Sequence, residues 1–76
     1  MGKVGTMHWK RFEKVLFVMG CEFIREKGDH RVYHKAGILR PVIVPRSTKL
    51  PVFIILNNLR TLGVSREEYE SILSKL

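Results

Sequence analysis

The chain lacks several features that would assign it to common protein classes. It has a single cysteine, Cys21, which excludes a disulfide scaffold. Its longest apolar run, residues 51–56, is far shorter than the roughly 20 residues of a membrane-spanning helix. Charged and polar residues recur near the N-terminus too often for a secretory signal. These absences predict a cytoplasmic protein with no membrane segment.

Acidic residues are scarce as well, since seven Asp and Glu stand against fourteen Lys and Arg, a net charge of +7. Residues 1–63 carry most of the excess, with twelve basic and four acidic side chains. The 76 residues, 45% of them apolar, predict one small domain over 1–76. A small cationic domain favours a polyanionic partner, because released counterions drive binding to phosphate backbones. Nucleic acid is therefore the expected partner.

Apolar residues recur every three or four positions over residues 7–19, which predicts an amphipathic helix. Thr6 is expected to cap its start and Gly20 to end it. The expected buried side chains are Trp9, Phe12, Val15, Leu16 and Met19, and the expected polar face holds Lys10, Arg11, Glu13 and Lys14.

Three short strands are predicted next, over residues 21–26, 30–35 and 39–44. The turn Lys27-Gly28-Asp29 joins the first two, because glycine readily adopts a positive φ. Pro41 lacks an amide donor and marks an edge strand or a strand start. The short connections favour an antiparallel meander.

A second helix is expected from Pro51, and a capping box of Ser65 and Glu68 predicts a third. The second helix is expected to bury Val52, Ile55, Leu56, Leu59 and Leu62, with Asn57, Asn58 and Arg60 facing outward. The order α-β-β-β-α-α is an α+β fold. Its helices should pack on one face of the three-stranded antiparallel sheet and leave the other face for a ligand.

Histidine is the only residue type in the chain that both takes and gives protons near neutral pH. His30 and His34 share one strand face at about 13 Å, too far apart for a common metal ion or one acid–base pair. No set of Cys, His and carboxylates has zinc-ligand spacing. The sequence therefore predicts neither a metal site nor a cofactor.

His30 is the candidate catalytic residue, because it follows the hairpin turn where an RNA phosphate can approach. A histidine there can deprotonate a ribose 2′-hydroxyl, and nearby cations can offset the charge that develops on phosphorus. The expected RNA contacts are Lys27, Gly28, Arg31, Tyr33, His34 and Arg46. Simpler readings stay open: His30 as a polar residue at a hairpin rim, His34 as a plain surface residue, and Tyr33 packed against the sheet.

Four segments carry a resemblance to a known family. They are Gly20-Cys21-Glu22-Phe23, the run from Arg25 to Tyr33, Val42-Ile43-Val44-Pro45-Arg46, and Gly63-Val64-Ser65 with Glu67-Glu68-Tyr69. In this order, over residues 6–74, they resemble the HicA (YcfA-like) toxins of type II toxin–antitoxin systems. The resemblance implies a double-stranded-RNA-binding-domain-like fold with a short extra C-terminal helix. It also implies metal-independent mRNA cleavage through one histidine, here His30, and a HicB-type antitoxin partner.

The chain departs from this family at two positions. Gly28-Asp29-His30 stands where the family usually has Gly-Ser-His, and Arg46 and Ser47 stand where members often carry a second histidine. Two alternatives therefore remain beside the ribonuclease. One is an RNA-binding module without catalysis, and the other is an interaction protein whose basic face binds an acidic partner.

Overall fold

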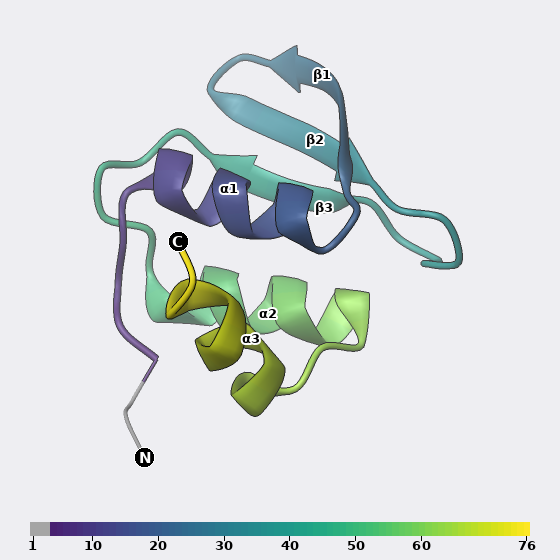
Figure 1. Cartoon of the computed structure of the whole chain (residues 1–76). Helices are drawn as coiled ribbons and strands as arrows, with labels where there is room; N and C mark the ends of the chain where they lie inside the picture. Colours follow the sequence, from purple (N-terminus) through teal and green to yellow (C-terminus); the bar gives the residue numbers. More distant parts are fainter. Residues whose placement is uncertain (1–3) are drawn as a thin grey trace.

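The computed structural model describes residues 4–76, and these form an α+β fold (Figure 1). In chain order the elements are α1 (Trp9–Val18), β1 (Glu22–Lys27), β2 (His30–His34), β3 (Val42–Pro45), α2 (Val52–Leu62) and α3 (Arg66–Leu73). The strands form one antiparallel sheet in the order β1-β2-β3. The predicted arrangement of a helix, a three-stranded meander and two further helices is confirmed. No helix in residues 4–76 is long and apolar enough to cross a membrane.

Helix α1 begins later than predicted, because the N-cap residue is His8 and not Thr6. The backbone before it is extended: Met7 forms a β-bridge with Leu50 and accepts a hydrogen bond of 2.8 Å from the Leu50 amide. The chain can turn into the helix only after this bridge. His8 then caps the helix, and its Nδ1 accepts from the Lys10 amide at 3.2 Å.

The turn between β1 and β2 consists of Gly28 and Asp29, so Lys27 lies directly opposite His30. Gly28 has φ +61°, the left-handed conformation for which the sequence required glycine. A bulge between Phe23 and Arg25 shifts the register of β1 by one residue. The pairing resumes with Arg25 opposite Val32 on the outer face of the sheet.

Strand β3 begins at Val42, three residues later than predicted. Residues 36–40 form turns and bends after His34, and Pro41 precedes the first paired residue. Pro41 has no amide to donate, which fits a position just outside the strand. The connection that leads into β3 is therefore a loop that stands out at one end of the sheet (Figure 1).

The core lies between one face of the sheet and the three helices. Tyr33, Val42 and Val44 are fully buried on the inner face of the sheet. The helices bury Phe12, Val15 and Leu16 from α1, Ile55, Leu59 and Leu62 from α2, and Tyr69 from α3. On the opposite face His30, His34 and Ile43 are exposed. The expectation that the helices share one face and leave the other open is confirmed.

Asn58 corrects the predicted polar face of α2, because it is only 8% exposed. Its side-chain amide donates to the carbonyl of Ile43 at 3.1 Å. This hydrogen bond ties α2 to the outer edge of β3, where a strand carbonyl lacks a further strand to bind it. The neighbouring Asn57 is exposed, as predicted. The capping box of Ser65 and Glu68 at the start of α3 is also confirmed.

Candidate nucleic-acid interface

His30 opens β2 on the exposed face of the sheet. Side chains alternate along a strand, so His30, Val32 and His34 point away from the helices, whereas Arg31 and Tyr33 point toward α1. The His30 side chain is 56% exposed. It lies between Lys27 on β1 and Pro45 on β3, the residues directly opposite it in the two ladders. An imidazole in this position is open to a ligand that lies across the end of the sheet.

The turn of the hairpin is bonded to the end of β3. The Arg46 amide donates to the Asp29 carbonyl at 2.8 Å, which places Arg46 beside the turn. The Arg46 guanidinium is half-exposed, with Nε 3.3 Å from a carboxylate oxygen of Glu26. Asp29 places a carboxylate oxygen 3.4 Å from Nδ1 of His30, with both side chains largely in solvent. Three predicted site residues, His30, Lys27 and Arg46, therefore gather at one end of the sheet.

Lys27 is the cation of this group whose charge is least compensated. Within residues 4–76, no carboxylate lies within ion-pair distance of its ammonium group. Arg46, in contrast, shares Glu26 with Arg31. Lys27 and His30 are paired residues on the same sheet face, so the lysine can attract a phosphate toward the imidazole.

Tyr33 is in the core, and the prediction that its ring contacts RNA is wrong. The residue is 0% exposed, and its ring packs edge-on against Phe17 and Phe23. Its hydroxyl donates to Glu13 on α1 at 2.5 Å. Burial, followed by the hydrogen bond to Glu13, raises the pKa of Tyr33 well above its usual value. A ring with no exposed surface cannot stack on a base, so the packing alternative holds.

Arg31, another predicted phosphate contact, also faces inward and is paired with carboxylates of the fold. Its guanidinium is bound by Glu13 and Glu26, each with an oxygen at 2.8 Å, and the side chain is 19% exposed. It lies 4.0 Å from the centroid of the Phe23 ring. The hydrogen bond with Tyr33 is the main contribution that raises the pKa of Arg31. Its charge is thus used within the fold, where it holds α1 to the sheet.

The two carboxylates that neutralise Arg31 were not predicted from the sequence. Glu13 was assigned to the polar face of α1, although it is half-buried against the sheet. Glu26 had a usable signal, because a two-residue turn at Gly28-Asp29 sets Glu26 directly opposite Arg31. Oppositely charged residues in directly opposed positions of two strands attract each other.

His34 and Arg25 extend the exposed face away from the hairpin. They line a shallow hollow of about 370 Å³ together with Ile24, Val32 and Pro41. Among the residues that the structure describes, Arg25 has no ion-pair partner. Glu22, opposite His34, supplies one carboxylate at the far end. The face therefore combines two histidines with cations along its length.

The remaining titratable candidates lie elsewhere. His8 is the N-cap residue of α1, and Cys21 is buried, which raises the pKa of its thiol. No three His, Cys, Asp or Glu side chains gather as a possible metal-binding group in the part of the chain from 4 to 76.

Fold and surface together define a small basic α+β protein whose helices cover one sheet face and whose other face carries two exposed histidines. The family model described as the HicA toxin of bacterial toxin–antitoxin systems matches residues 9–64, from the start of α1 to just past α2. The chain belongs to this family of toxins. Membership implies an antitoxin as partner. A search of curated proteins gives no match.

Proposed function

We propose that this toxin is an endoribonuclease that cleaves mRNA without a metal ion, with His30 as the general base. The observation that carries the proposal is the His30 imidazole, 56% exposed on the open sheet face with Lys27 directly opposite. A general base must reach the proton that it abstracts, and more than half of the His30 side chain is accessible to solvent. Family membership supports the same assignment.

In the proposed reaction His30 takes the proton from a ribose 2′-hydroxyl. The 2′-oxygen then forms a bond to the adjacent phosphorus, and the bond from phosphorus to the 5′-oxygen breaks. The products are a 2′,3′-cyclic phosphate and a 5′-hydroxyl, whose oxygen takes up a proton from water. Negative charge on the phosphoryl oxygens increases during the attack, so a cation nearby stabilises the transition state.

Lys27 and Arg46 are the proposed phosphate contacts at this end of the sheet. Lys27 has an uncompensated charge among the described residues, and Arg46 is held beside the turn by its amide bond to Asp29. At Gly28 an added Cβ would meet no atom within 4 Å, so the turn surface is open to an approaching backbone. His34, on the same face, would contact the strand farther along.

The proposed protein partner is a HicB-type antitoxin with an acidic surface that covers this face. A net charge of +7 on a chain of this size provides the complementary field. Covering His30 would stop RNA from reaching the base, which is how such a partner would neutralise the toxin.

The test uses the purified protein and single-stranded RNA in the presence of EDTA. Wild type is expected to yield 2′,3′-cyclic phosphate ends, and His30→Ala to cleave at least about 100-fold more slowly, since positioned proton transfer contributes that much or more. His8→Asn is the matched control, because it removes an imidazole but keeps a good N-cap residue. Undiminished cleavage by His30→Ala would remove this residue from the mechanism, and equal cleavage of DNA would exclude the 2′-hydroxyl.

One observation favours a second function, an RNA-binding module without catalysis. The Asp29 carboxylate, 75% exposed and 3.4 Å from the His30 ring, places a negative charge where the phosphate would lie. In the same EDTA assay this alternative predicts that RNA is retarded but stays intact. Asp29→Ser would then gain cleavage. A protein that binds no RNA even at low salt would instead be an interaction protein for an acidic partner.

A further inference from the structure

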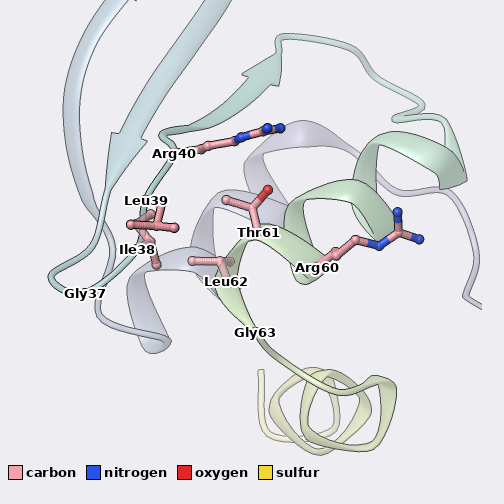
Figure 2. A pocket seen from close by; sticks show the side chains of 8 residues that line it. All are labelled: Gly37, Ile38, Leu39, Arg40, Arg60, Thr61, Leu62 and Gly63. Carbon is pink, nitrogen blue, oxygen red and sulfur yellow. The ribbon is translucent and has the colours of Figure 1, made fainter.

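A second cavity lies at the opposite end of β2 from His30. It has a volume of about 430 Å³ and opens between the connection from Gly37 to Arg40 and the last turn of α2 (Figure 2). His30 and His34 are about 13 Å apart along β2, and this connection follows His34. The cavity is therefore separate from the hairpin site.

Two arginines give the cavity a strong positive charge. Arg40 comes from the β2–β3 connection and Arg60 from α2, and both side chains extend to the same side in Figure 2. No acidic residue lines the cavity, and neither arginine has an ion-pair partner among residues 4–76. Arg40 and Arg60 thus contribute two uncompensated positive charges to the lining of one cavity. Guanidinium groups match phosphate oxygens with paired hydrogen bonds.

The C-terminal end of α2 lies at this cavity, and two of its carbonyls are already bonded. The carbonyls of Leu59 and Arg60 already accept hydrogen bonds from the amides of Val64 and Gly63. Arg60 itself stands in the last helical turn, where a cation offsets the helix dipole.

The rest of the cavity is apolar, apart from one hydroxyl. Ile38 and Leu62 form part of the wall, and Leu39, which also lines the cavity, is fully exposed. Thr61 places a hydroxyl on the α2 side. An apolar wall, a hydroxyl and two cations together suit a nucleotide, which has a flat ring, a ribose and a phosphate.

The cavity lies beside one end of the open face that the proposed function assigns to RNA, although its α2 wall belongs to the helix-covered side. Pro41 lines the hollow beside His34, and Arg40, the preceding residue, lines this cavity. A strand that passes His30 and crosses His34 would thus arrive at Arg40. This adjacency, together with two guanidinium groups that suit phosphate, favours RNA over an acidic peptide as the occupant.

We propose that the cavity between the β2–β3 connection and the end of α2 is a second RNA-binding site. It holds one nucleotide of the RNA strand. Several nucleotides away along the same strand, the phosphate that is attacked lies at His30. The inference rests on the proposed function, which identifies the ligand as RNA. It adds that the toxin must bind a longer stretch of RNA than the hairpin site alone covers.

The experiment measures binding in a His30→Ala background, in which RNA is not cut. Fluorescent single-stranded RNAs of about four and about twelve nucleotides are compared, lengths within the range that a small domain covers. Arg40→Gln combined with Arg60→Gln should weaken binding of the longer RNA about tenfold and leave the shorter RNA nearly unchanged. The salt slope for the longer RNA should fall by about 1.4, since each contact to a single-stranded phosphate contributes about 0.7.

The matched control removes the same charge from α3 and the residues that follow it, with Arg66→Gln combined with Lys75→Gln. Both residues are exposed, and neither has an ion-pair partner within the described part of the chain. This control should change the affinity for the longer RNA by less than about twofold. If both pairs of substitutions weaken binding equally, charge alone explains the affinity and the site is refuted.

Leu39→Ser tests the apolar wall without a change of charge. Leu39 is fully exposed, so its replacement costs no core packing, and binding of the longer RNA should weaken about threefold. Unchanged affinity would refute the nucleotide contact. A peptide that contains Glu and Leu is tested in the same binding assay. If the Arg40 and Arg60 substitutions weaken binding of this peptide but not of RNA, the site belongs to a protein partner and the proposal fails. If the wild-type protein does not cleave RNA, the proposed nuclease function is refuted, but these binding results are unaffected.

Discussion

Glu13→Ala should lower the free energy of unfolding by about 2 to 3 kcal/mol. One carboxylate oxygen of Glu13 accepts from both Nε and a terminal nitrogen of Arg31, at 3.1 and 2.8 Å, and from the Tyr33 hydroxyl. Hydrogen bonds to charged groups contribute about 1.5 to 3 kcal/mol each, and breaking a buried pair costs about 3 to 5 kcal/mol. The side chains of Arg31 and Glu13 are 19% and 17% exposed, and Glu26 still neutralises Arg31. Both facts place the loss below that range.

The measurement is urea unfolding, with Lys14→Ala as the control. Lys14 is an exposed residue of the same helix, so its replacement should stay within about 0.5 kcal/mol. With a slope near 1 kcal/mol per molar for a small chain, Glu13→Ala should lower the midpoint by about 2 to 3 M. The shift should persist at high salt, because a partly buried network is weakly screened. Equal midpoints for the two variants would refute the structural role of the network.

Tyr33→Phe separates the two partners of Glu13, because it removes only the hydroxyl and keeps the buried ring. Combined with Glu13→Ala in a double-mutant cycle, it should show a coupling energy of about 0.5 to 3 kcal/mol. A coupling energy of zero would mean that the short hydrogen bond between Tyr33 and Glu13 contributes nothing to stability.

Two further predictions concern other buried polar groups. Asn58→Ala should destabilise the protein by about 1 to 2 kcal/mol in thermal or urea unfolding, because the Ile43 carbonyl loses its donor, whereas Asn57→Ala should be neutral. Burial raises the pKa of Tyr69 from 10.0 to about 12, so the folded state keeps this proton at pH values where the unfolded state loses it. The free energy of unfolding should therefore fall as the pH rises from about 10 to about 12, by about 2 to 3 kcal/mol for this group. Tyr69→Phe should show a shallower decline over that window, and identical pH profiles would contradict the assignment.

Local sequence signals were sufficient for the order and type of the elements. The three- and four-residue spacing of apolar residues located α1 and α2, and the pairing of Ser65 with Glu68 located the start of α3. Gly28 predicted the hairpin correctly because a positive φ is costly for other residues. Each of these signals acts within a few residues along the chain, so it can be interpreted without knowledge of the fold.

Element boundaries were less predictable where distant segments compete for the backbone. Thr6 has a suitable N-cap side chain, yet the bridge between Met7 and Leu50 keeps it outside the helix. The third strand was expected from Leu39, but pairing with β2 begins only at Val42. At the helix start a contact between residues far apart in sequence decided the boundary, whereas at β3 the turn residues 36–40 and Pro41 delay the pairing.

The exposure of His30 followed from strand alternation, whereas the roles of its neighbours depended on packing. Arg31 and Tyr33 looked suitable for RNA contacts by residue type and position. They face α1, and Glu13 from that helix binds both. A cation and a hydroxyl that point inward must find partners there, because an unpaired buried polar group is costly.

The spacing of apolar residues, the turn glycines and the excess of basic side chains were enough to determine the α-β-β-β-α-α order, the open face and its histidine. These are properties of single segments. Which cations remain free for a ligand was decided only when α1 came to lie on the sheet and Glu13 and Glu26 neutralised Arg31. The cavity of Arg40 and Arg60 likewise exists only because a strand connection and a helix end meet. Charge can be counted along a chain, but its availability depends on which opposite charges the fold brings within about 4 Å.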